Sequence, residues 1–157
     1  MTKFQKISLF LLRISTGWFM FWAGLSHVLD PKFSAGGYLA NAKSFVGLYH
    51  FLANPAVLPV VNFLTAWGLT LLGVSLILGL AVSFSSKLGV VLMVLFWLPL
   101  GILHPDTHSF IVDDHIIYAA ALLVLASMHA GRVYGLENWC SKLPICSKFP
   151  KLRNWLG

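Results

Sequence analysis

The pattern of hydrophobic positions divides the chain into four long apolar stretches, separated by short polar or turn-forming segments. These stretches run over about residues 7–28, 57–82, 88–103 and 111–128. A helix needs about 20 residues to cross the hydrocarbon core of a membrane, and it satisfies its backbone hydrogen bonds without water. The pattern therefore predicts an all-α integral membrane protein. We expect a four-transmembrane-helix bundle over residues 1–132 and a basic, aromatic tail over residues 133–157.

Composition supports this interpretation. Hydrophobic residues make up 58% of the chain and charged residues only 10%, whereas a soluble domain carries about a quarter charged residues. The net charge of +6 comes from basic residues at the ends of the apolar stretches and in the tail. Such positions suit the head groups of a lipid bilayer, so we expect no nucleic-acid partner.

The distribution of Lys and Arg predicts the orientation in the membrane. Most of these residues fall on the side that holds both termini, and only Lys32 and Lys43 fall on the other. Because cytoplasmic loops carry the excess of basic residues, both termini should be cytoplasmic. The first apolar stretch continues past Gly24 without a clean cleavage site, so we expect a retained span and not a signal peptide.

The connections between the stretches are of unequal length. The long outer loop over residues 29–56 is rich in aromatic and aliphatic side chains, which predicts one short amphipathic helix at the membrane surface or folded over the bundle. Residues 83–87 are expected to form a tight cytoplasmic turn. The tail carries Trp139, Trp155 and several lysines, a composition typical of an interfacial cytoplasmic segment.

The first stretch carries a stripe of small and polar residues on one helical face: Arg13, Gly17, Met20, Gly24 and His27. The two glycines would let another helix approach closely. Arg13 has two interpretations. It could extend to the membrane surface as a topology anchor, or it could bind an anionic group or a quinone carbonyl.

Two further features concern the last two stretches. Pro99 lies inside the third, where a kink would free backbone carbonyls for a neighbour or a ligand. The fourth has a matching polar stripe at helical spacing, formed by Asp114, Tyr118, Ala121, Leu125, His129 and Arg132.

Titratable residues gather at the end of the bundle that we expect to be outside. The group comprises His27, Asp30, His104, Asp106, His108, Asp113, Asp114 and His115. Three interpretations remain open. The residues could be solvated loop ends in which an Asp caps a helix. They could form a quinone and proton site, because His titrates near neutral pH and quinone reduction needs donors and protons. They could bind a metal, although the ligand spacing matches no strong pattern.

Several segments resemble a known family. RISTGWFMFWAGLSH, YLANAKSF, VDDHIIYAAALLVLA and AGRVYGLENW are similar to the DoxX/DoxD family of membrane proteins, and most similar to its DoxD branch. The resemblance implies the membrane subunit of a thiosulfate:quinone oxidoreductase in a prokaryotic plasma membrane. That enzyme oxidises thiosulfate to tetrathionate and passes the electrons to a membrane quinone. The resemblance also implies a smaller, DoxA-like partner subunit.

With this resemblance, the candidate site residues fall into two sets. Asp113, Asp114, His115 and Tyr118 are the candidate catalytic group: one Asp caps the fourth helix, and the other Asp orients or protonates a redox ligand with His115 and Tyr118. Arg13, His27, Trp97, His104 and Arg132 are the candidate contacts to the quinone, and Trp22, Trp67 and Trp97 could flank its ring. We expect no haem or metal in this chain.

Two alternatives to this function remain. The chain could be a non-catalytic accessory subunit of a respiratory complex, with Gly68, Gly73 and Gly79 packing against larger partners. It could also be a membrane partner in a thiol-redox complex that uses Cys140 and Cys146. These cysteines could be free thiols or a disulfide.

Overall fold

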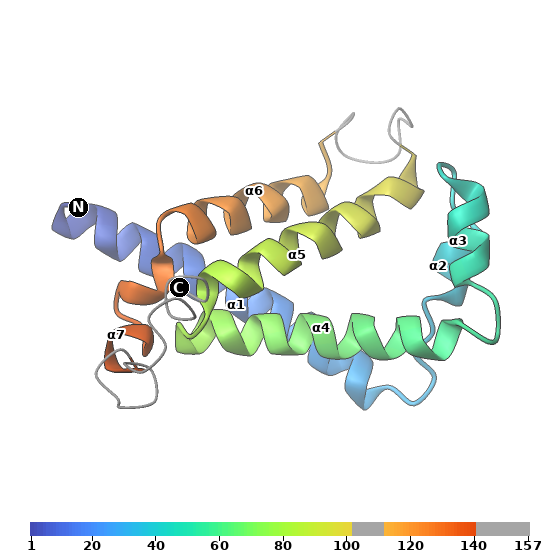
Figure 1. Ribbon diagram of the computed structural model, residues 1–157, viewed down its shortest axis with the longest axis horizontal. Helices are drawn as coiled ribbons and strands as arrows, with labels where there is room; N and C mark the ends of the chain where they lie inside the picture. The colour runs from blue at the N-terminus through green and yellow to red at the C-terminus, as the bar shows by residue number, and fades with distance from the viewer. Residues whose placement is uncertain (102–111, 141–157) are drawn as a thin grey trace.

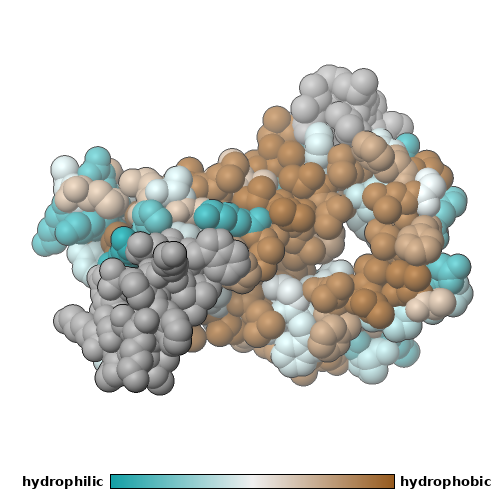
Figure 2. Space-filling model, in the orientation of Figure 1, coloured by the Kyte–Doolittle hydropathy of each residue, from teal (hydrophilic) through white to brown (hydrophobic). Residues whose placement is uncertain are grey.

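The computed structural model describes residues 1–101 and 112–140, and in these ranges every regular element is a helix (Figure 1). Three helices are long and apolar enough to cross a membrane. They are α1 (Lys3–Leu29), α4 (Leu58–Leu78) and α5 (Val82–Trp97), the last continued by the 3₁₀ turn η1 (Leu98–Leu100). These three helices indicate a membrane protein. On the face shown in Figure 2, apolar residues cover most of the middle, and hydrophilic residues are more frequent toward the two ends.

The fourth predicted span corresponds to a shorter helix. α6 (Asp114–Ser127) has 14 residues, a length of about 21 Å against a hydrocarbon core of about 30 Å. The turn η2 (Ala130–Arg132) and the short helix α7 (Glu137–Cys140) follow it. They lie at the same end of the molecule as the N-terminus (Figure 1). We call this the termini end.

The long loop forms two short helices, α2 (Gly36–Ala40) and α3 (Val46–Leu52), where the sequence predicted one. The Asn41 side-chain amide donates to the Gly37 carbonyl at 2.7 Å, which ends α2. The Lys43 amide then donates to the Pro99 carbonyl at 2.8 Å and ties the loop to η1. Leu39 and Tyr49 are buried in a small separate core here. We call this the loop end, on the right in Figure 1.

The turn between α4 and α5 lies earlier than predicted. Gly79 has a left-handed φ of 68° and ends α4, as glycine readily does after a helix. Ala81 is also left-handed, with a φ of 53°, and α5 begins at Val82. Residues 83–87 therefore form the first turns of α5, and the prediction of a turn there is wrong.

α1 and α4 approach each other through glycines, as the stripe on the first stretch predicted. A Cβ at Gly17 would lie 2.8 Å from the Leu76 Cβ. A Cβ at Gly24 would overlap the Thr70 backbone, and one at Gly73 would overlap the Phe21 backbone. Each contact brings one helix backbone against the other. The predicted buried face of α1 is therefore confirmed over Arg13, Gly17, Met20 and Gly24.

α6 packs part of its predicted polar stripe against the bundle, since Tyr118 stacks on Phe19 of α1 whereas Asp114 is exposed. Its buried residues are Ala119, Leu122, Leu125 and Ala126, of which only Leu125 belongs to the predicted stripe. This face of α6 is buried because its small and aliphatic side chains pack closely against α5. A Cβ at Gly89 of α5 would lie 2.9 Å from Leu122 Cδ1.

Pro99 ends the α-helical part of α5, so the predicted kink is a change to a 3₁₀ turn. Proline has no N–H, so the Leu95 carbonyl loses its partner within the helix. The Tyr49 hydroxyl donates to this oxygen at 2.8 Å, and the Tyr38 hydroxyl donates to the Phe96 carbonyl. Burial is the main cause that raises the pKa of both tyrosines, so both hydroxyls remain donors at neutral pH. Two tyrosine side chains of the long loop thus donate hydrogen bonds to the backbone carbonyls at the end of α5.

The glycine contacts predict that alanine substitution affects stability differently at two positions of α4. Gly73→Ala should lower the free energy of unfolding by about 1–3 kcal/mol, because the new methyl group overlaps the Phe21 backbone. Gly68→Ala should be neutral or stabilising, because its Cβ would lie 3.8 Å from Leu92 Cδ2 and alanine favours a helix. Thermal unfolding in detergent measures both. Equal effects would contradict the close approach at Gly73.

The hydrogen bond from Tyr49 to the Leu95 carbonyl gives a second prediction. Tyr49→Phe should destabilise the protein by about 0.5–1.5 kcal/mol, because it removes the hydrogen bond from the buried tyrosine to the partly buried Leu95 carbonyl. Tyr134, whose side chain is exposed, provides the control. Tyr134→Phe should leave the unfolding temperature in detergent near that of the wild type. An unfolding temperature unchanged by Tyr49→Phe would contradict the role of this hydroxyl.

Candidate functional site

Polar and aromatic side chains form two clusters at opposite ends of the molecule. The loop-end cluster comprises Tyr38, Phe96, Asp113 and His115. The termini-end cluster comprises Arg13, His129, Arg132 and Glu137. Arg13 and His27 are separated by 14 residues of α1, which is about 21 Å along the helix. The structure therefore does not bring Arg13 and Arg132 to the residues predicted to act at the other end.

Asp113 organises the loop-end cluster. It is the N-cap of α6, and its Oδ1 accepts a hydrogen bond from the His115 backbone N–H at 2.9 Å. Its Oδ2 lies 2.8 Å from His115 Nδ1. The same carboxylate thus caps the helix and orients the imidazole, whereas the sequence analysis divided these roles between two Asp residues. Both side chains are 30% exposed, so the pair remains accessible.

α5 and α2 complete the loop-end cluster. The Phe96 ring meets His115 edge-on, with the ring centroids 6.0 Å apart and the planes at 79°. The Tyr38 hydroxyl binds the Phe96 carbonyl, and the Asp113 charge contributes to the raised pKa of Tyr38. An imidazole is therefore held between a carboxylate and an aromatic ring, close to a phenol. Such a group can bind a polar ring and exchange protons.

The other residues predicted for this end have different surroundings. Asp114 is exposed in the first turn of α6, and Tyr118 stacks on Phe19 of α1 at 4.5 Å. His27 stacks on Phe33 at 4.0 Å. Trp97 is half-buried at the end of α5, and His104 lies outside the described residues. Of the four candidate catalytic residues, only Asp113 and His115 are in direct contact with each other.

Arg13 is the buried centre of the termini-end cluster. Its side chain is 1% exposed, and its Nη2 donates to the Tyr134 carbonyl at 3.1 Å. The guanidinium carbon lies 5.5 Å from the centre of the Phe10 ring. A Cβ at Gly79 or Gly135 would overlap Nη1, so these glycines make room for the charge. Arg13 is thus enclosed by residues at the end of α4 and in the segment after α6.

Glu137 faces Arg13 from α7. Its Oε1 lies 3.4 Å from Arg132 Nε, and its backbone N–H donates to the Gly79 carbonyl at 3.0 Å. Among the described residues, Oε2 of Glu137 and both Nε and Nη1 of Arg13 have no hydrogen-bond partner. Burial raises the pKa of Glu137, while Arg132, His129 and Arg13 act in the opposite direction. The cluster thus holds the segment after α6 against the end of α4.

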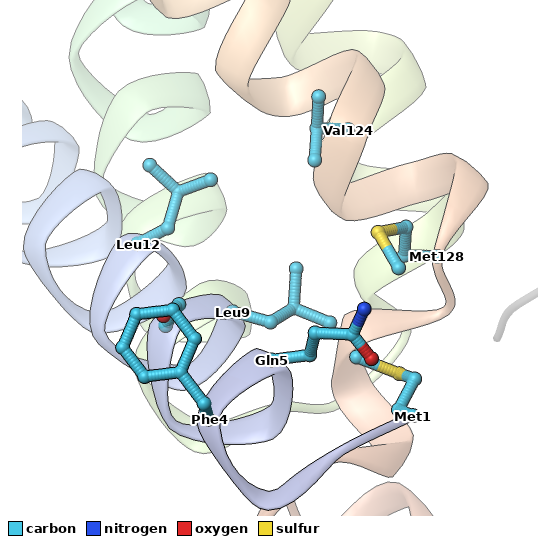
Figure 3. Close-up of a pocket in the computed structure, with 8 residues that line it drawn as sticks. Met1, Phe4, Gln5, Leu9, Leu12, Val124 and Met128 are labelled. Carbon is cyan, nitrogen blue, oxygen red and sulfur yellow. The ribbon is translucent and has the colours of Figure 1, made fainter.

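Two open grooves of the described residues are mostly apolar. One, of about 350 Å³, lies between the start of α1 and the end of α6, where Leu9 and Leu12 lie across from Val124 and Met128 (Figure 3). The other, of about 360 Å³, lies between α4 and α5 around Gly68. Neither is lined by a residue of the two clusters. In residues 1–101 and 112–140 no group of three or more His, Cys, Asp or Glu residues could hold a metal ion.

The sequence analysis missed three members of the clusters. Tyr38 and Phe96 were not linked to Asp113 because they lie on segments far apart in the chain. Pro99 was the available signal for this part of the cluster, because a proline inside a helix indicates carbonyls that need a donor from elsewhere in the chain. Glu137 was noted only within the AGRVYGLENW segment, and its apposition to Arg13 depends on a chain reversal after α6.

The described structure is that of a helical membrane protein with an imidazole–carboxylate pair at one end and a buried arginine at the other. No family model matches the chain, and searches of curated proteins and of solved structures find no match.

The raised pKa of Glu137 predicts a pH dependence of stability. Because the folded state holds this proton more tightly than the unfolded state, the contribution of Glu137 is complete below about pH 4.5 and is lost as the pH rises through the folded-state pKa. Glu137→Gln should remove this part of the pH dependence of the unfolding temperature. Asp114→Asn, at an exposed position, is the control and should leave it unchanged. If the unfolding temperature of Glu137→Gln depends on pH as strongly as that of the wild type, burial does not raise the pKa of Glu137.

Proposed function

We propose that this chain is the membrane subunit of a thiosulfate:quinone oxidoreductase, as its resemblance to the DoxD branch implies. The observation that carries the proposal is the Asp113–His115 pair, joined at 2.8 Å and accessible at the loop end. In the proposal, this pair binds a membrane quinone and supplies protons to it. The chain is then a multi-pass protein of a prokaryotic plasma membrane.

The chemistry of the pair fits this role. When the Asp113 carboxylate accepts a hydrogen bond from His115 Nδ1–H, the tautomer of the ring is fixed and Nε2 is left to face a ligand. The carboxylate also holds the imidazole in one orientation, as a triad aspartate does. A protonated Nε2 donates to a quinone carbonyl and then transfers the proton as the ring is reduced. Phe96 provides an aromatic edge beside this position.

The proposal includes an arrangement in the membrane. α6 and its flanking residues form a fourth span over about residues 111–128, and both termini are cytoplasmic. This arrangement follows the bias of Lys and Arg toward the termini end. It places the Asp113–His115 pair at the outer surface, where protons exchange with the external medium.

The sulfur chemistry is assigned to a DoxA-like partner subunit. Two thiosulfate ions form the central S–S bond of tetrathionate and release two electrons, and the quinone takes up these two electrons with two protons. Thiosulfate is a dianion, whereas residues 104–112 carry Asp and no Lys or Arg. Electrostatics therefore favour thiosulfate binding on the partner and quinone binding on this chain.

The test is thiosulfate-dependent reduction of a short-chain quinone by the complex that co-purifies with this chain. His115→Gln should lower turnover by about 10²-fold or more, because the proton donor is removed. Asp113→Asn should lower it as well, since the imidazole loses its orienting carboxylate. Asp114→Asn is the matched control, because this neighbouring carboxylate is exposed and should be dispensable.

Wild-type turnover in an assembled His115→Gln complex would reject the proposed role of the pair. A complex that assembles but shows no thiosulfate-dependent turnover in the wild type would instead support an accessory subunit. Activity lost only when Cys140 and Cys146 are replaced by serine would support a thiol-redox partner.

A further inference from the structure

Two tyrosines of the long loop make the same kind of hydrogen bond to the end of α5, but they differ in exposure. Tyr38 of α2 donates to the Phe96 carbonyl, and Tyr49 of α3 donates to the neighbouring Leu95 carbonyl at 2.8 Å. Tyr49 is 1% exposed, whereas Tyr38 is 39% exposed. Fastening the loop to α5 does not require an exposed side chain, since Tyr49 makes its bond while buried. Tyr38 is therefore available for a second contact.

Phe96 joins Tyr38 to the Asp113–His115 pair. Its carbonyl accepts the hydrogen bond from Tyr38, and its ring meets His115 edge-on with the ring centroids 6.0 Å apart. The charge of Asp113 also acts on Tyr38, where it follows burial among the causes that raise the pKa of the hydroxyl. Both members of the pair are 30% exposed. Accessible polar groups of α2 and α6 thus gather around one residue of α5.

The direction of the Tyr38 hydrogen bond determines what its hydroxyl can do for a ligand. A tyrosine hydroxyl has one proton to donate, and its oxygen can also accept. The proton is donated to the Phe96 carbonyl, and no described residue donates to the oxygen. Because the raised pKa keeps the proton on the hydroxyl, Tyr38 is not a proton source at neutral pH. Tyr38 therefore offers a ligand an acceptor, whereas His115 offers a donor.

Reduction of a quinone changes the hydrogen bonds that its ring can make. The oxidised ring has two carbonyl oxygens that only accept, whereas the reduced ring has two hydroxyl groups that also donate. In the proposed function, His115 binds one of these oxygens. An acceptor near the other oxygen gains a hydrogen bond only when the ring is reduced.

We propose that Tyr38 is the second polar contact of the quinone ring, and that its oxygen accepts a hydrogen bond from a hydroxyl of the reduced form. This inference rests on the proposed function and adds to it a selectivity for redox state. The loop-end cluster then binds the hydroquinone product more tightly than the quinone substrate, and Tyr38 is the residue that determines the difference.

The affinities for duroquinone and for durohydroquinone test this role of Tyr38. Both are measured by calorimetry on the complex that co-purifies with this chain, under anaerobic conditions and without thiosulfate. Tyr38→Phe should weaken the binding of durohydroquinone by about three- to tenfold, which corresponds to one hydrogen bond, and should change the binding of duroquinone by less than about twofold. Tyr49→Phe is the matched control, because it removes the same kind of bond to the adjacent carbonyl at a buried position. It should leave both affinities unchanged.

Equal weakening of both ligands in Tyr38→Phe, or an unchanged affinity for durohydroquinone, would overturn the acceptor role of Tyr38. His115→Gln separates this result from a failure of the proposed function, because it should weaken the binding of both ligands. If His115→Gln weakens both and Tyr38→Phe weakens neither, only the role of Tyr38 is rejected. If neither ligand binds the wild type, or if His115→Gln changes neither affinity, the proposed quinone site is rejected together with the role of Tyr38.

Discussion

Close contact between α1 and α4 positions the other elements, because helices in lipid gain little from burying apolar side chains and associate through close packing. Glycines on both helices allow the two backbones to approach, with Gly17 and Gly24 on α1 and Gly73 on α4. The contact also orients α1 so that Arg13 is carried to the end of α4, beside Gly79. One packing interaction therefore determines where the buried positive charge lies and which face of α1 remains outside.

The two ends of the molecule satisfy their polar groups in different ways. At the termini end, Arg13 binds the Tyr134 carbonyl and faces Glu137, so the chain after α6 folds back and covers the charge. At the loop end, Pro99 frees the Leu95 carbonyl, and tyrosines from the long loop donate to this oxygen and to the Phe96 carbonyl. At the first end the Arg13 charge is buried, which suits a structural role. The second leaves an imidazole–carboxylate pair partly open, which suits exchange of protons with a ligand.

Much of the helical content could be predicted, because apolar stretches and the spacing of Gly17 and Gly24 report directly on membrane helices and their contacts. The turn after α4 was misplaced because the polar residues 83–87 were weighted above Gly79, which is the stronger signal for a helix end. The polar stripe of the fourth stretch did not indicate the buried face of α6, because that face is formed by small and aliphatic residues such as Ala119 and Leu122. The partner of Arg13 is a backbone carbonyl, which no residue type could indicate.

The most direct test of the account is to map where a photoreactive quinone attaches to the intact complex. The account predicts that the label is found by mass spectrometry on the peptides that contain Phe96 and His115, and that excess unlabelled quinone prevents it. Label confined to other parts of the chain, or label at these peptides that excess quinone does not reduce, would contradict the assignment of the quinone to the loop end.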